Sequence, residues 1–571
     1  MSMNEFDDTT LRDRIAANPR PALLWLVGAF VLIALELGRI ADGVLRLGGA
    51  IGLMVDMVVT IPSSVRGAVA SSFGAGAGIA AFVITAFILL GIVAIVVKWL
   101  FIPWSLVDRL GIDVSTGRED ILERLLVTGL LVIVAAALVW TPVGGLFEML
   151  ISVLTRGVEA VGSLTTITSR EVIPNQGYQL PDGSWEGTFL GLSPAWAWAL
   201  RVLVVYAYAL TWLAWLWKGY EIFREHYREA DWTPRDDSIN RLRTHYWGVF
   251  GFVVVFMFVV MALWAPAVSP VTAEANLYSP YGNEIQYYGD DGVQSITHGD
   301  ANMNSRSQGG DENVGLMSYD DYDRFHPFGT NTDGKDLFTF LAYGAQVSLV
   351  IGLLATVLMA VVATVLALIT AYYKGVADLL AIIASDSVIA LPRLLLVLLL
   401  SVLFMQANHP IAEIYDGGLL LALIFAGTGW PLLWRSVRGP ALQVSEQEWI
   451  DAAKSYGQSP AATMRKHMSP YIAGYMLIYA SLSLGGVIIG VAALSYLGFG
   501  VQAPTPEWGR AVFEGKSYVS TSSWHVATLP GLLVVFLVTG FNALGDGIRD
   551  AIDPQSDSGD GSAAAATGGG G

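Results

Sequence analysis

One stretch of the sequence, GRAVFEGKS at residues 509–517, contains the residue types that bind phosphate groups in nucleotide-hydrolysing proteins. In a phosphate-binding loop four residues separate the two glycines, whereas five residues separate Gly509 from Gly515. No apolar strand leads into the stretch either. The spacing argues against a nucleotide site, and we expect a re-entrant or interfacial segment with Trp508 and Trp524 at the headgroup level of a membrane.

A second candidate for chemistry is the acidic cluster formed by Asp320, Asp321 and Asp323 together with His326. Carboxylates and an imidazole could bind a cation, but these residues lack the regular spacing of a calcium loop. The seven histidines include no H-E-x-x-H pair, and the chain has no cysteine. We therefore expect neither a metal site nor a cofactor, and we interpret the cluster as a solvated loop.

A third candidate is the pair Asp386 and Arg393, which lie seven residues apart within one apolar run. That spacing corresponds to about two helical turns and predicts that both side chains lie on one face. Charges inside a membrane span are costly and often functional. Two interpretations stay open: the two residues line a transport pathway, or they form a structural pair near Pro392.

The elements that position these residues are predicted to be membrane helices. Of the 571 residues, 54% are hydrophobic and only 14% are charged, with a mean hydropathy of +0.54. Residues 337–373 and 467–506 contain no aspartate, glutamate, lysine or arginine, and both runs exceed the roughly 20 residues that cross a bilayer. The composition predicts an all-α, polytopic membrane protein. Its net charge of −17 disfavours nucleic-acid binding.

Hydropathy predicts about ten transmembrane helices, near residues 23–37, 78–97, 125–143, 196–217, 247–267, 347–372, 379–404, 419–434, 471–494 and 529–544. Two weaker stretches, 51–61 and 144–161, are interpreted as interfacial or re-entrant pieces, although either could be an eleventh span.

The basic residues predict the orientation of these spans, because short loops rich in arginine and lysine stay in the cytoplasm. The loop after the fourth span carries Lys218, Arg224, Arg228, Arg235, Arg241 and Arg243. Counting from this loop places both termini in the cytoplasm. The segment 271–336, with 12 acidic and three basic residues, is then extracellular, and 435–470 is cytoplasmic.

The sequence thus divides into five parts. We expect a cytoplasmic N-tail (1–21), a four-helix membrane extension of unknown role (22–218), a basic cytoplasmic linker (219–244), a six-helix module (245–553) and a disordered tail (554–571). The six-helix module contains the acidic extracellular insert 271–336 and the cytoplasmic loop 435–470.

The cytoplasmic loop is polar, helical in pattern and rich in capping signals. Ser445 and Glu448 fit an S-x-x-E capping box. Gly457 is placed to end the first helix, and Ser459 before Pro460 starts a second. Trp449, Ala452, Ala453 and Tyr456 recur at helical spacing and predict one apolar face. From the pattern alone this is either an interfacial helix or a docking element for a soluble partner.

The run GWPLLWRSVRGPALQVSEQEWIDAAKSYGQSP (429–460) resembles the EAA loop of ABC-importer permeases, the helix that sits in a cleft of the ATPase subunit. Asp451, Ala452 and Ala453 match Glu-Ala-Ala, with Asp451 shorter than the usual glutamate, and Gly457 matches the glycine. Two further regions, 326–349 and 494–554, are similar to the C-type subunit of the dipeptide, oligopeptide and nickel branch. The resemblance covers about residues 240–554.

This resemblance implies a type I permease module with an ATPase-coupling loop that includes Glu448, Asp451, Ala452, Ala453 and Gly457. It implies a second permease subunit as heterodimer partner, two ATPase subunits and an extracellular substrate-binding protein. The chain would be a transport subunit and not an enzyme, since ATP hydrolysis would belong to the partner ATPases. The cargo stays open among peptides, nickel chelates and sugars. The alternative is a secondary transporter or channel that works without ATP, which would need intramembrane carboxylates such as Asp386.

Overall fold

The computed structural model of the chain describes residues 10–101, 116–140, 142–230, 232–290, 292–406 and 410–552. These residues are mostly helical, as predicted. Among the described residues, six helices are long and apolar enough to cross a membrane, or up to eight spans if each of two bent helix pairs is one span. The predicted count of ten is not confirmed. The predicted disordered tail, 554–571, lies outside the described residues.

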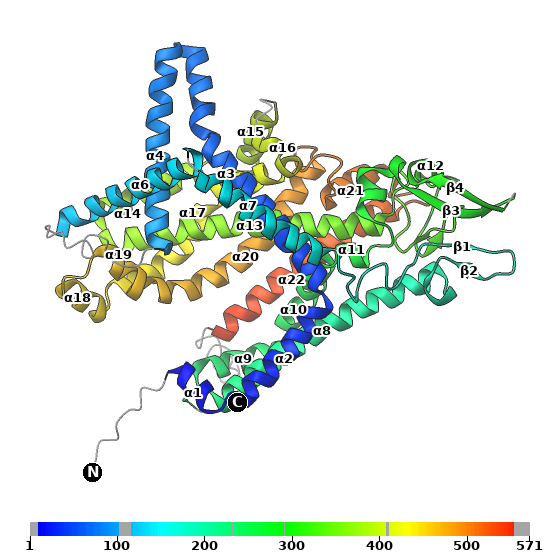
Figure 1. Ribbon diagram of the computed structural model, residues 1–571, viewed down its shortest axis with the longest axis horizontal. Coiled ribbons are helices and arrows are strands. Elements are labelled where there is room, and N and C mark those ends of the chain that lie inside the picture. The colour runs from blue at the N-terminus through cyan, green and yellow to red at the C-terminus, as the bar shows by residue number, and fades with distance from the viewer. Residues whose placement is uncertain are drawn as a thin grey trace, which may run out of the picture. The chain divides into compact units, whose positions relative to one another are not determined.

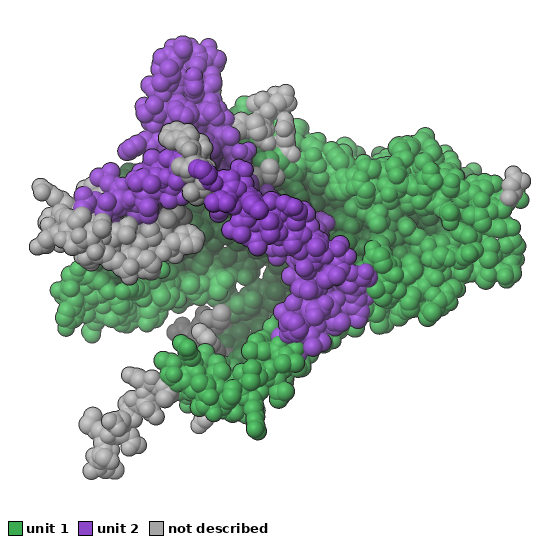
Figure 2. Space-filling view, in the orientation of Figure 1, with its two compact units in different colours: residues 1–27, 168–571 green, residues 28–167 purple. Residues whose placement is uncertain are grey.

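The described chain divides into two compact units (Figure 2). Unit 1 contains residues 1–27 and 168–571, and unit 2 contains residues 28–167. The boundary falls inside α2 (Pro19–Leu35), which follows the short helix α1 (Leu11–Ala17) at a bend of 96°. Helix α8 (Pro194–His226), part of the predicted extension, is grouped with the permease helices in unit 1.

Unit 2 consists of long helices that contact one another in pairs. They are α3 (Leu37–Phe73), α4 (Ala75–Phe101), α6 (Thr116–Trp140) and α7 (Pro142–Gly162). The weak stretches 51–61 and 144–161, predicted as short pieces, belong to the long helices α3 and α7. Gly74 turns the chain between α3 and α4 with a φ of +90°, a conformation that favours glycine.

Unit 1 contains the helices of the predicted permease module (Figure 1). The long ones after α8 are α10 (Tyr246–Leu263), α13 (Leu337–Tyr373), α14 (Gly375–Ile389), α15 (Arg393–Gln406), α17 (Gly418–Ser445), α20 (Ser469–Tyr496) and α22 (His525–Ile552). The short ones are α9 (Pro234–Thr244), α11 (Ala265–Val268), α12 (His298–Asn304), α16 (Pro410–Glu413), α18 (Glu448–Ser455), α19 (Pro460–Thr463) and α21 (Trp508–Gly515).

The centre of unit 1 is the packing of α13 against α17, with α20 beside both. Four alanines and Met359 recur every fourth residue on α13 and are at most 2% exposed: Ala355, Met359, Ala363, Ala367 and Ala371. Residues four apart lie on one helix face, and small side chains let two helices approach closely. This seam explains why α17 is the most buried of the candidate spans.

Short strands occur only outside the long helices in the described part. They form two-stranded antiparallel sheets: β1 (Tyr178–Gln179) with β2 (Trp185–Glu186), β3 (Glu284–Gly289) with β4 (Gly292–Thr297), and β5 (Ser318–Tyr319) with β6 (Phe325–His326). Single 3-10 or π turns cover Phe189–Gly191, Glu274–Tyr278, Pro280–Gly282, Ile414–Gly417, Met464–Met468 and Lys516–Tyr518. The acidic insert 271–336 is therefore a folded region that contains strands, which the all-α prediction did not include.

Two arginines, Arg201 and the partly buried Arg170, connect the extension to the turn that follows α10 and α11. Arg201, on α8, is 0% exposed and donates to the carbonyl oxygens of Ala267 (2.6 Å), Ile173 (2.8 Å) and Ser269 (2.9 Å) and to Asn175 Oδ1 (2.8 Å). A helix end leaves carbonyl groups without intrahelical partners, and these guanidinium donors satisfy them.

The second arginine, Arg170, donates to the carbonyl oxygens of Pro266 (3.1 Å), Pro270 (2.9 Å), Val271 (2.6 Å) and Ser269. Burial lowers the pKa of Arg170 to about 10, which still leaves the group charged at neutral pH. Arg170 and Arg201 together make residues 168–201 a fixed part of unit 1.

Candidate coupling loop and membrane-embedded charges

The loop 435–470 joins two long helices of unit 1. Helix α17 ends at Ser445, α18 and α19 follow, and a π turn over Met464–Met468 leads into α20. The predicted pair of short helices between two spans is confirmed. Figure 1 shows α18 and α19 at the end of unit 1 opposite to the strands β1 to β4.

The start of α18 differs from the prediction. Ser445 is the last residue of α17, where its Oγ donates to the carbonyl oxygen of Leu442 at 2.8 Å. Gln447 is the N-cap of α18, and it makes no side-chain capping bond. The predicted capping box of Ser445 and Glu448 is wrong, because α17 continues to the residue that should have been the cap.

The end of α18 agrees with the prediction. Gly457 has a φ of +74°, and a Cβ atom at this position would meet nothing within 4 Å. The glycine is therefore required by the backbone conformation and not by lack of space. Ser459 caps α19 by accepting from the amide of Ala462, and Ser469 is the first residue of α20.

The four residues of the predicted apolar face of α18 differ in their exposure. Ile450 is 0% exposed and Ala453 is 9% exposed, so these two side chains hold the helix to the chain. Ala452 is exposed, Trp449 is 42% exposed and Tyr456 is 92% exposed. Most of the apolar surface of Trp449, Ala452 and Tyr456 is thus left uncovered, whereas Ala453 packs against the chain.

Two carboxylates lie on the exposed side of α18. Asp451 forms an exposed ion pair with Lys454, with 3.3 Å between Oδ1 and Nζ. Glu448, in the first turn, is also exposed. Acidic side chains in a first turn favour the helix through its dipole, but an exposed pair such as Asp451 and Lys454 contributes little stability.

The loop contacts the ends of two membrane helices. Glu446 pairs with Lys374 at the end of α13, with 3.4 Å between Oε1 and Nζ. Lys454 lies 5.3 Å from the ring centre of Tyr372, and Trp449 stacks on Tyr471 at the start of α20. The loop is therefore attached to α13 and α20 as well as to α17.

The two charges predicted to share a helix face do not do so. Asp386 lies on α14 and Arg393 begins α15, and these helices meet at an angle of 80°. Pro392 cannot donate a backbone hydrogen bond and disfavours helical conformation before it, which explains the break. Asp386 pairs with Arg435 of α17, whereas Arg393 lies over the ring of Phe425 at 5.5 Å.

A second ion pair, which the sequence analysis missed, also joins α14 to α17. Arg438 Nε donates to Asp378 Oδ1 at 2.7 Å, and the two groups form a second contact. Arg435 and Arg438 lie three residues apart on one face of α17. That spacing is the sequence feature that could have predicted a pair of ionic contacts from this face. Asp386 and Asp378 thus fix α14 to α17.

The stretch that resembles a phosphate-binding loop is the helix α21 followed by a 3-10 turn. A Cβ atom at Gly509 would lie 1.9 Å from the carbonyl oxygen of Ala492, so this glycine packs against α20 and leaves no room for a phosphate. Trp508 is 2% exposed and its Nε1 donates to the carbonyl oxygen of Leu341 at 2.8 Å. Its predicted place at the headgroup level is therefore wrong, because it belongs to the core.

The acidic cluster of the insert 271–336 is partly buried, which corrects its interpretation as a solvated loop. The side chains of Asp320 and His326 are 1% and 0% exposed, and His326 also contacts Asp336 at 2.9 Å. Arg324 pairs with Asp320 at 2.6 Å. Among the described residues, no group of three or more metal-ligating side chains could hold a metal ion.

This buried network should make stability depend on pH. Burial alone would lower the pKa of His326, but hydrogen bonds with Asp320 and Asp336 outweigh it and raise the pKa above 6.5. A histidine whose pKa is higher in the folded than in the unfolded state stabilises the fold fully when the pH is below the pKa of the unfolded state. This stabilisation is lost as the pH rises through the pKa of the folded state. We expect the unfolding midpoint of the purified chain to fall as the pH rises above about 6.5.

Thermal unfolding between pH 6 and 9 measures this effect. The variant His326→Gln should be less stable at pH 6 and should lose the pH dependence over this range. The matched control is His226→Gln, since His226 is exposed. A wild-type midpoint that stays level or rises over the range would contradict the assignment.

The long apolar helices of unit 1, joined by the loop 435–470, are those of a multi-pass membrane protein. The chain matches the family described as "Binding-protein-dependent transport system inner membrane component" over residues 363–557. Residues 233–284 match the family described as "N-terminal TM domain of oligopeptide transport permease C".

Two relatives show the extent of the similarity. The chain is 34% identical over 245 residues to the glutathione transport system permease protein GsiD of Escherichia coli O1:K1 / APEC, which covers 42% of this chain and 77% of that protein. It is 29% identical over 324 residues to the dipeptide transport system permease protein DppC of Alkalihalophilus pseudofirmus. This similarity covers 57% of this chain and 90% of that protein. The chain therefore belongs to the family of ABC-importer permeases. It is a transport subunit, and ATP hydrolysis belongs to a separate subunit.

Proposed function

We propose that this permease imports short peptides. The relatives named above are permeases for dipeptides and for glutathione, itself a short peptide derivative, and they support this substrate class. The rival function, a transporter or channel independent of ATP, would need a carboxylate free to couple an ion. Asp386, the candidate for that role, is engaged by Arg435. This pairing favours a structural role for Asp386 over ion coupling.

The observation that supports ATP-driven transport is the uncovered apolar surface of α18. Ile450 and Ala453 anchor the helix, while Ala452 and Tyr456, one turn apart, face away from the chain. An exposed aromatic beside a small residue is suited to enter a cleft of another protein. We propose that this surface, flanked by Glu448 and Asp451 and ended by Gly457, docks an ATPase subunit.

The contacts of the loop supply a route from the ATPase to the membrane helices. Motion of α18 would act on α13 through Glu446 and Lys374 and on α20 through Trp449 and Tyr471. The ion pairs of Asp386 with Arg435 and of Asp378 with Arg438 would make α14 move together with α17. Rigid-body movement of packed helices is the usual form of such transitions.

The remaining organisation follows from this role. We propose that 245–553 is the transport module, that 22–218 is an added extension, and that both termini and the loop 435–470 face the cytoplasm. The insert 271–336 then faces outward, toward an extracellular substrate-binding protein. A second permease subunit would complete the pathway as a heterodimer, and two ATPase subunits would drive it.

Uptake into proteoliposomes tests the function. The chain, reconstituted with its partner permease, ATPases and binding protein, should accumulate radiolabelled trialanine only when ATP is present on the side of the loop 435–470. A non-hydrolysable ATP analogue is the control and should give no accumulation. Accumulation driven by a proton or sodium gradient without ATP would support the rival function instead.

A further inference from the structure

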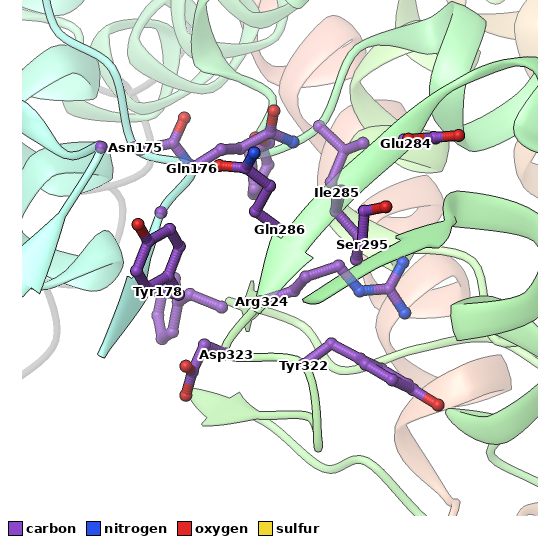
Figure 3. Close-up of a pocket in the computed structure, with 15 residues that line it drawn as sticks. Asn175, Gln176, Tyr178, Glu284, Ile285, Gln286, Ser295, Tyr322, Asp323 and Arg324 are labelled. Carbon is purple, nitrogen blue, oxygen red and sulfur yellow. The ribbon is translucent and has the colours of Figure 1, made fainter. Parts of the chain in front are cut away.

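A cavity of about 440 Å³ lies at the strand-bearing end of unit 1 (Figure 3). Its first wall is 175–178 with Gly187, from the extension. Its second wall is the hairpin of β3 and β4, and its third wall is 322–325 from the acidic insert. The volume falls within the roughly 300–1,000 Å³ typical of small-molecule sites.

The first and third walls are held by buried contacts, so the cavity is built into the fold. Asn175 donates to the carbonyl oxygen of Pro270 at 3.1 Å and accepts from Arg201 at 2.8 Å. Arg324 donates to Asn302 Oδ1 at 2.7 Å and to Asp320 Oδ2 at 2.7 Å. The carboxylate of Asp323 accepts from the amide of Gln179 at 3.0 Å, which joins the two walls.

Several polar side chains around the cavity make no polar contact within the part of the chain that is described. Gln176 comes from the first wall, and Gln286, Glu284 and Ser295 come from the second (Figure 3). A primary amide both donates and accepts, so the two glutamines can pair with the N–H and C=O groups of a peptide bond. A hydroxyl and a carboxylate complete a set suited to a polar ligand with amide groups.

The charge of the cavity favours a cation. Arg324 is already compensated by Asp320, at 2.6 Å, so its guanidinium offers little attraction to an anion. Glu284 and Asp323 remain as carboxylates on the lining, within an insert of 12 acidic and three basic residues. A carboxylate pairs with an ammonium group through charge-assisted hydrogen bonds, which are stronger than neutral ones.

We propose that this cavity binds the amino-terminal part of a short peptide, with its ammonium group at Glu284 and its first amide groups at Gln176 and Gln286. The choice of a peptide as ligand rests on the proposed function. The residues that line the cavity lie outside the candidate membrane spans. It gives the extension and the insert a shared role, which is to hold substrate on the outer face.

The third wall also connects the cavity to the transport helices. His326, two residues after Arg324, contacts Asp336 at 2.9 Å, and Asp336 caps α13 by accepting from the amide of Thr339 at 2.7 Å. Helix α13 then runs through the unit to Lys374, the residue that contacts the coupling loop. A peptide in the cavity would thus contact a wall that is fixed to the start of α13.

Calorimetric titration of the purified full-length chain tests the site without any partner subunit. Trialanine should bind, and N-acetyl-trialanine, which has no ammonium group, should bind at least tenfold more weakly. Glu284→Gln should weaken the binding of trialanine at least tenfold and should have little effect on the binding of the acetylated peptide. Gln286→Ala should weaken both peptides.

The matched control is Glu312→Gln, because Glu312 is an exposed carboxylate of the same insert outside the cavity. It should leave trialanine binding unchanged. Glu284 is exposed, so Glu284→Gln should keep the unfolding midpoint of the wild type. Absence of trialanine binding, or equal binding by wild type and Glu284→Gln, would overturn the proposal.

The same peptide separates this proposal from the proposed function. ATP-driven uptake of trialanine without binding to the isolated chain would overturn the cavity site and keep the importer. Binding that depends on Glu284, without ATP-driven uptake, would support the cavity site and remove the proposed transport of peptides.

Discussion

Replacing Arg201 by methionine should strongly destabilise unit 1, although Arg201 lies outside the predicted permease module. The substitution removes four hydrogen bonds and leaves the buried carbonyl groups of Ala267, Ile173 and Ser269 with one donor fewer. A buried polar group that loses its partner costs roughly 1–3 kcal/mol. The methionine variant no longer carries the free-energy cost of burying a charged guanidinium, and this offsets part of the loss. We expect a net loss of about 3 kcal/mol.

Thermal unfolding of purified variants measures this loss. Arg201→Met should lower the midpoint by several degrees, and Arg201→Lys should lie between it and the wild type, since one ammonium cannot replace the whole guanidinium fork. Arg224→Met is the matched control, because Arg224 lies exposed on the same helix. Equal midpoints for the Arg201 and Arg224 variants would show that the extension is only loosely attached.

Replacing Ala452 by aspartate, or Tyr456 by alanine, should abolish most ATP-driven uptake while leaving the stability of the isolated chain unchanged. Both side chains are exposed, and Tyr456 is 92% exposed, so neither change disturbs the core. In the docked state, the aspartate would bring an unpaired charge into an apolar contact, and the alanine would remove the main anchor. We expect at least a tenfold loss of uptake in each variant.

Co-purification of the ATPase subunits with the tagged permease should fall in parallel with uptake. Tyr246→Ala is the control, because Tyr246 is 89% exposed and lies outside the loop. Ala453→Asp is a less suitable test, since Ala453 is 9% exposed and a charge there would disturb the loop itself. Normal uptake in both Ala452→Asp and Tyr456→Ala would exclude this surface as the ATPase contact.

The parts of the fold that depend on local sequence patterns were predictable. Long apolar runs predicted the helices of unit 1, because a bilayer requires about 20 apolar residues in succession. Gly457 and Ser459 predicted the break between α18 and α19, because a left-handed conformation and an N-cap each favour few residue types. These signals are local, and tertiary contacts did not override them.

Other features were missed, some of them because contacts join residues far apart in the sequence. Arg201 bonds to carbonyl groups more than 60 residues away, and backbone carbonyls carry no sequence signature. The burial of Asp320 and His326 depends on Arg324 and Asp336, so an acidic cluster with one histidine could not be distinguished from a solvated loop. The prediction that Asp386 and Arg393 share a face assumed one unbroken helix, but α14 ends before Pro392.

Site-specific photo-crosslinking at position 456 tests the central claim most directly. A benzophenone amino acid in place of Tyr456 puts a reactive group on the surface proposed to dock the ATPase, and the same group at Tyr246 is the control. Irradiation of membranes that contain the assembled transporter should join position 456, but not position 246, to an ATPase subunit. Crosslinks from position 456 to lipid alone would contradict the claim, since the loop would then be an interfacial helix.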